Sequence, residues 1–186
     1  PTFPGNAHSR RHGRRHGAAR KAAMTHLEEH SLPYMDKALP DAWKAATTFA
    51  SAISREAAQH GLSLAEGEII KIRVSQLNGC VFCLDLHSRQ ARKLGVPQQK
   101  LDLLPAWRES TLFSDREAAL LAVAETATTL PLSEDSKADL LAARSALGQE
   151  AFVSAEWVAT TINIFNRISI LSEHPVRARD AEGKLS

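Results

Sequence analysis

Residues 68–88 read EIIKIRVSQLNGCVFCLDLHS, and this stretch holds both cysteines of the 186-residue chain. Cys80 and Cys83 are three residues apart, and His87 follows one helical turn later. If the segment from Cys80 onward is helical, each side chain turns by about 100° from the last, so the two thiols and the imidazole share one face near a helix start. Unpaired N–H groups and the helix dipole favour a thiolate there, and a neighbouring histidine can relay its proton. The spacing predicts a dithiol redox centre.

The length and composition predict one globular domain. The chain is 44% hydrophobic and 24% charged, which is ordinary for a globular protein. It contains no apolar run long enough to span a bilayer and no apolar signal-peptide core behind the basic N-terminus. We therefore expect a cytoplasmic protein without a membrane partner. In a reducing compartment a C-x-x-C pair is more often catalytic or metal-binding than structural.

The charges are distributed unevenly along the chain. Residues 1–27 contain six Lys and Arg residues and no acidic residue, whereas the remainder carries 17 basic and 21 acidic residues. Residues 1–27 are also rich in Gly and His without apolar periodicity, which predicts a disordered basic tail. We expect a helical domain over residues 28–175 and a frayed polar tail over residues 176–186. The mildly acidic domain gives no reason to expect a nucleic-acid partner.

Helical periodicity recurs through the domain. The run IIKIRV has strong β propensity, but a capping box at Ser63–Glu66 precedes it and Asn78-Gly79 follows it, which together favour a helix. A second capping box lies at Ser114–Glu117. Helices are expected over about residues 33–60 (kinked at Pro40, with Asp41 as N-cap), 63–78, 80–94, 98–104, 114–129, 133–147 and 149–172.

The last expected helix is apolar on more than one side, so it is expected to be central or to pack against another subunit. The sequence shows no strand ladder, no phosphate-binding glycine loop and no βαβ pattern. The fold class predicted from these patterns is all-α, and a thioredoxin fold is disfavoured despite the C-x-x-C pair.

The pattern E-x11-C-x2-C-x3-H, formed by Glu68, Cys80, Cys83 and His87, resembles the signature of AhpD-like alkylhydroperoxidases within the carboxymuconolactone decarboxylase superfamily. The segments KIRVSQLNG, AWRES, FSDREAAL and INIFNR are also similar to the core of this family, so the resemblance covers about residues 45–175. It implies an AhpD-like helical bundle that forms homo-oligomers, trimers or hexamers. One position departs from the family pattern: the best-known member has a histidine just before the second cysteine, where this chain has Phe82.

The resemblance also implies a role for each residue of the pattern. Cys83 matches the cysteine that attacks an alkyl or hydrogen peroxide and becomes a sulfenic acid. Cys80 matches the residue that donates a proton and then resolves the sulfenic acid as a disulfide, and Glu68 and His87 match the relay that activates the thiol. No cofactor is implied beyond this redox-active disulfide, which an external dithiol or a lipoyl-type reductant protein would reopen.

Three alternatives remain open from the sequence. Cys80, Cys83 and His87 could bind zinc with His60 or Glu68 as a fourth ligand, although structural zinc sites usually draw on two separated ligand pairs. A decarboxylase acting on a lactone acid would share the superfamily's fold, but such enzymes do not depend on a cysteine pair. A helical scaffold with incidental cysteines would leave the phasing of His87 and the spacing of Glu68 unexplained.

Overall fold

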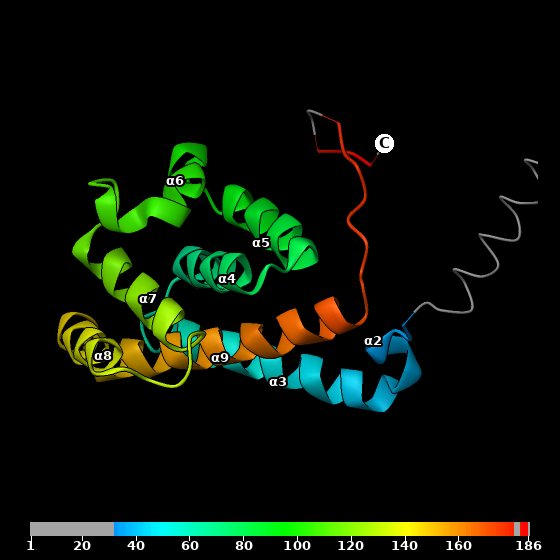
Figure 1. The fold of residues 1–186 in the computed structure, drawn as a ribbon, viewed down its shortest axis with the longest axis horizontal. Coiled ribbons are helices and arrows are strands. Elements are labelled where there is room, and N and C mark those ends of the chain that lie inside the picture. Colours follow the sequence, from blue (N-terminus) through cyan, green and yellow to red (C-terminus); the bar gives the residue numbers. More distant parts are fainter. Residues whose placement is uncertain (1–31, 181–182, 186) are drawn as a thin grey trace, which may run out of the picture. The chain divides into compact units, whose positions relative to one another are not determined.

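The computed structural model describes residues 32–180 and 183–185, and the predicted tail over residues 1–27 lies outside them. Tyr34–Ser186 form one unit, separate from Pro1–Pro33. The described part of this unit is built from helices, with one isolated bridge between Arg179 and Leu185, so the all-α prediction is confirmed. The helices are α2 (Met35–Ala38), α3 (Pro40–Gln59), α4 (Leu64–Asn78), α5 (Val81–Lys93), α6 (Gln98–Leu103), the 3₁₀ helix η1 (Leu104–Glu109), α7 (Asp115–Thr126), α8 (Glu134–Leu147) and α9 (Gln149–Leu171) (Figure 1).

Helix α4 is the structural centre of the unit and packs against α5, α7 and α9. Its apolar residues divide between two hydrophobic clusters. Ile70 and Val74 pack with α7 and α9 side chains, while Ile69 and Ile72 pack with the cluster that contains Trp107. Because α4 is buried on two sides, its apolar residues are spread around the helix and do not form one narrow stripe. The same packing outweighs the β propensity of the segment.

Capping boxes begin α4 and α7, as predicted. Ser63 Oγ accepts a hydrogen bond from the Glu66 N–H, and the Glu66 carboxylate accepts one from the Ser63 N–H. Ser114 and Glu117 make the same reciprocal pair at the start of α7. Each box satisfies two N–H groups that the first turn of a helix leaves without partners.

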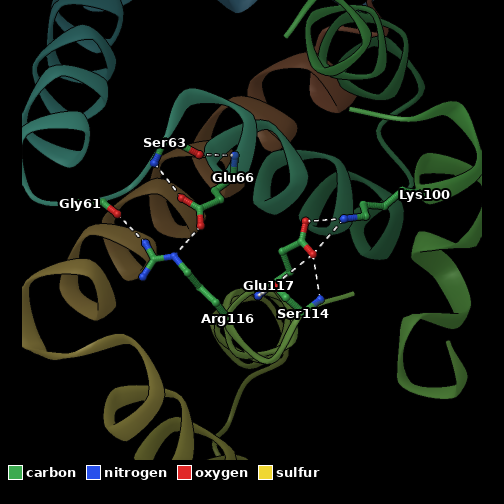
Figure 2. Close-up of polar contacts among 7 residues, drawn as sticks. All are labelled: Gly61, Ser63, Glu66, Lys100, Ser114, Arg116 and Glu117. Carbon is green, nitrogen blue, oxygen red and sulfur yellow. Dashed lines mark hydrogen bonds and ion pairs between the residues drawn. The ribbon is translucent and has the colours of Figure 1, made fainter. Parts of the chain in front are cut away.

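The same two boxes are joined to neighbouring segments (Figure 2). Arg116 of α7 donates from Nε to Glu66 Oε1 at 2.6 Å and also bonds the Gly61 carbonyl, so α7 holds the chain just before α4. Lys100 of α6 pairs with Glu117 at 2.7 Å. These links fix where α4 begins, one turn before Glu68.

The first long helix differs from the expectation at its start. Asp41 does not cap it: Leu39 occupies the N-cap position and Pro40 is the first helical residue, with Asp41 inside the first turn. Proline suits this position because its missing N–H would have no helical partner and its φ is already helical. Leu64 and Leu77 lie exposed near the two ends of α4, whereas Ile70 and Val74 between them are buried.

Helix α9 packs against α3, α4, α7 and α8, and its inner face is buried, including Phe152, Val158 and Ile162. Its other side exposes large apolar side chains, among them Val153, Trp157 and Ile164. Trp157 makes an edge-to-face contact with Phe49 of α3, which is itself partly exposed. In the part of the chain that the structure describes, no helix combines the length and apolar character required to cross a bilayer.

Candidate active site

The two cysteines lie where α4 passes into α5. Gly79 adopts a left-handed conformation (φ 69°) after the last residue of α4, a backbone geometry that glycine adopts at little cost. The turn places Cys80 at the N-cap position of α5 and Cys83 in its first turn. Both thiols are free and buried, and their sulfur atoms are 2.7 Å apart. A disulfide needs about 2.05 Å, so a small approach of the two sulfurs would close one.

Glu68 and His87 meet as a buried pair. His87 Nδ1 lies 2.7 Å from Glu68 Oε2, and Lys71 Nζ donates to Glu68 Oε1 at 2.7 Å. Burial would raise the pKa of the Glu68 carboxyl, but the hydrogen bond from His87 and the charge of Lys71 outweigh it, and the pKa lies below its ordinary value. An ionised Glu68 holds a proton on His87 Nδ1 and so fixes the orientation of the ring, with Nε2 on the side away from the carboxylate.

The contact between the two sulfurs shifts the pKa values of Cys80 and Cys83 in opposite directions. The hydrogen bond from the Cys80 thiol is the strongest influence on Cys83; burial opposes it, and the pKa of Cys83 falls from 9.0 to about 6. Further lowering comes from Ser169, Asn166 and the charge of His87. The same sulfur–sulfur contact, together with burial, raises the pKa of Cys80. Cys83 is therefore the more acidic of the two thiols.

A cavity of about 420 Å³ opens beside Cys83 and His87. Its wall is mostly apolar and comes from α3, α5 and α9, with Asp36, Lys71 and His174 among its charged or titratable members. The apolar side chains around it are Trp43, Ala50, Ile53, Phe82, Leu86, Val158, Ile162 and Phe165. This volume far exceeds that of one water, about 30 Å³, so the cavity can hold an organic group of some size next to the thiolate.

Comparison with known proteins identifies the family of this chain. Residues 40–126 match the model of the Carboxymuconolactone decarboxylase family. The uncharacterized protein YdfG of Bacillus subtilis (strain 168) is 38% identical over 112 residues, which are 60% of this chain and 76% of YdfG. The chain belongs to the carboxymuconolactone decarboxylase family.

Two further proteins are similar to this chain. The crystal structure of ATU0492 from Agrobacterium tumefaciens, a protein of unknown function described as a candidate antioxidant defence protein AhpD, has a TM-score of 0.67 at 30% identity and covers 79% of this chain and 99% of its own. The uncharacterized protein YnjA of Escherichia coli (strain K12) is 34% identical over 67 residues, 36% of this chain and 37% of YnjA. The AhpD-like fold expected from the sequence is confirmed.

The region that matches the carboxymuconolactone decarboxylase family includes all four residues of the predicted site, and the structure brings them into two adjoining pairs. Cys80 contacts Cys83, and Glu68 contacts His87. Among the hydrogen bonds of the described residues, none joins His87 directly to either sulfur, although both His87 and Cys83 line the cavity. A proton moving between them therefore has to pass through the cavity, on a water or on the substrate.

One contact of Cys83 comes from outside the matched region and was missed by sequence reasoning. Ser169 Oγ of α9 lies 3.7 Å from Cys83 Sγ, and Asn166, one turn earlier, is fully buried. Asn163, Asn166 and Ser169 are spaced by three residues among the apolar residues of the second half of α9. That spacing places them on one face of the helix. Polar residues on one face of a buried helix indicate a hydrogen-bonded site, and this pattern could have identified them from the sequence.

Phe82, the position that departs from the family pattern, also lines the cavity. Its ring lies 5.3 Å from that of His174, which follows α9 and approaches Asp36 Oδ1 at 3.2 Å. The C-x-x-C segment has no imidazole at position 82, but His174 of the C-terminal segment places one in the wall of the same cavity.

The geometry does not favour the metal-binding alternative. The described residues contain no cluster of three or more His, Cys, Asp or Glu side chains arranged to hold a metal ion. His60 lies at the end of α3, where its ring nitrogens approach Glu150 at 3.4 Å and Glu56 at 3.9 Å. Glu68 is already bonded to His87 and Lys71.

Proposed function

We propose that this protein is a thiol-dependent peroxidase that reduces organic hydroperoxides. The observation that carries the proposal is the buried Cys80–Cys83 contact, with the low-pKa sulfur facing a large apolar cavity. A peroxide O–O bond is opened by a thiolate rather than a thiol, and an adjacent thiol converts the resulting sulfenic acid to a disulfide. Membership of a family with an AhpD-like relative supports an antioxidant role.

The reaction proceeds in three balanced steps. The Cys83 thiolate attacks the terminal oxygen of ROOH, the O–O bond breaks, and one proton completes the products, Cys83 sulfenic acid and the alcohol ROH. The Cys80 thiol then attacks that sulfur and releases water as the disulfide forms. An external dithiol, on a lipoyl group or a partner protein, finally exchanges with the disulfide, is oxidised itself, and restores both thiols.

His87 and Glu68 act as the proton relay. His87, oriented by Glu68, accepts the proton when Cys83 ionises and returns it to the leaving alkoxide through the cavity. Replacement His87→Ala and Glu68→Gln should slow turnover, and Cys83→Ser should abolish it. A Cys83→Ser protein with full peroxidase activity would overturn the assignment.

Intact mass measured after one equivalent of cumene hydroperoxide tests the proposal directly. Fully reduced protein is expected to lose two hydrogens, and digestion should locate a Cys80–Cys83 bridge. A Cys83→Ser control should form no bridge. If both thiols of the wild-type protein stay free, the peroxidase proposal fails.

We also propose that the protein is a homo-oligomer, a trimer or hexamer. The exposed Phe49–Trp157 pair and the neighbouring Val153 form an apolar surface on α3 and α9 that a second copy would cover. Sedimentation velocity at micromolar concentration tests this; a monomer there would contradict it.

A further inference from the structure

Helix α9 brings one hydroxyl into contact with the Cys83 sulfur and holds a buried amide one turn earlier. Ser169 lies 86 residues after Cys83 in the sequence, yet its Oγ is 3.7 Å from Cys83 Sγ, within the longer range that sulfur hydrogen bonds allow. Asn166 is one helical turn earlier on the same face. Both side chains are buried, so neither can exchange a protein partner freely for bulk water.

The orientation of the Asn166 amide is fixed by its neighbours. Asn78 Nδ2 donates its two N–H groups to Asn163 Oδ1 and Asn166 Oδ1, both at 2.9 Å, so Asn166 must present its oxygen to Asn78. On the other side, Ser75 Oγ donates to the Lys71 carbonyl at 2.7 Å and can therefore only accept from Asn166 Nδ2, at 3.0 Å.

This orientation leaves one N–H of Asn166 uncommitted, because an amide nitrogen has two and Ser75 takes only one. Asn166 also lowers the pKa of the Cys83 thiol, as expected of an N–H group close to the sulfur. The Ser169 hydroxyl, which can rotate, influences both sulfurs.

We propose that Asn166 and Ser169 are donors that bind the Cys83 sulfur as a thiolate, Ser169 through its contact with the sulfur and Asn166 through its buried, uncommitted N–H. The inference rests on the proposed function for its catalytic meaning. Because a hydroxyl or amide N–H can stabilise a sulfur anion but gains less from a neutral thiol, two such donors on one sulfur favour its ionisation. The same donors would then remain in place as the sulfenic acid forms.

The test is the pH dependence of iodoacetamide alkylation, measured in a Cys80→Ser background so that Cys83 is the only thiol. Removing one donor to a charged group should raise the midpoint by about one pH unit. One pH unit below the background's midpoint, Asn166→Ala and Ser169→Ala should therefore react about tenfold more slowly, with equal rates at high pH. Ser169→Thr keeps the hydroxyl and should restore the midpoint.

Ser154→Ala is the matched control. Ser154 is a buried hydroxyl of the same helix, about four turns before Ser169, and its loss should leave the alkylation midpoint unchanged. Should Asn166→Ala fail to fold by circular dichroism, Asn166→Leu replaces it, since it keeps a similar side-chain volume, removes the amide donors and adds no charge beside the sulfur. An unchanged midpoint in the folded Asn166 variant, or in Ser169→Ala, overturns that residue's assignment.

The outcomes separate this inference from the proposed function, because no peroxide is used. Shifted midpoints in a protein that never reduces cumene hydroperoxide would leave the donor pair standing and overturn the peroxidase. Normal peroxide reduction with unshifted midpoints would overturn the donor pair alone.

Discussion

Replacing Cys80 by alanine should make Cys83 a markedly weaker acid. The Cys80 thiol is the strongest influence that lowers the pKa of Cys83 from 9.0 to about 6. The whole change corresponds to about 4 kcal/mol, at 1.36 kcal/mol per pH unit. A hydrogen bond to a charged group contributes about 1.5–3 kcal/mol, so losing it should raise the pKa by one to two units. At pH 7 the thiolate fraction would fall from about nine-tenths to about one-half or less.

Iodoacetamide alkylation of Cys83 between pH 5 and pH 9 measures this effect. Cys80→Ser is the matched control, because it also removes the second thiol but keeps an O–H donor facing the Cys83 sulfur. We expect the midpoint of Cys80→Ser to stay near that of the wild type and that of Cys80→Ala to rise. Equal midpoints in the two variants would refute the claim that the Cys80 thiol lowers the pKa of Cys83.

Three further predictions concern the cavity, the buried carboxylate and the helix caps. Ala50→Phe, which fills part of the cavity wall, should slow the reaction with cumene hydroperoxide more than with hydrogen peroxide, as stopped-flow rates would show; equal slowing would contradict a role for the cavity in substrate binding. The folded-state pKa of Glu68 is depressed, so its stabilising contribution is present above its unfolded pKa and is lost as the pH falls through the folded pKa. Between pH 7 and pH 3, the free energy of unfolding in urea should therefore fall less for Glu68→Gln than for the wild type. An equal fall in the two proteins would contradict a stabilising role of the Glu68 charge. Ser63→Ala and Ser114→Ala should each lower the free energy of unfolding by about 1 kcal/mol in urea, and no change would show that the capping boxes do not stabilise their helices.

Local signals predicted the helices well because most of them are fixed by their own ends. The two capping boxes and the glycines at positions 79 and 148 mark helix boundaries that the structure keeps. The errors lie where tertiary packing decides. Leu64 and Leu77 are apolar like Ile70 and Val74, yet they are exposed near the two ends of α4. Periodicity identifies a face, but it does not tell how far along a helix the neighbours reach.

The motif likewise predicted which residues meet, since Glu68 and His87 have complementary charges and a spacing that two packed helices can bridge. The distribution of protons between the thiols could not be predicted from the motif. Cys80 and Cys83 have the same side chain, so only the environment of each sulfur distinguishes them. Part of that environment comes from α9, which is distant from the motif in sequence and contacts Cys83 only through tertiary packing.

The contribution of α9 bears on how the site can vary among relatives. The family match ends at residue 126, yet the hydroxyl that contacts Cys83 lies at position 169, and the buried amide proposed as a second donor lies at position 166. A relative could keep the whole E-x11-C-x2-C-x3-H pattern and carry apolar residues at these two positions. Its Cys83 counterpart would lose donors, its thiol would ionise at higher pH, and the two cysteines would become more nearly equivalent. The motif therefore specifies a cysteine pair, and we expect the last helix to adjust how readily Cys83 ionises.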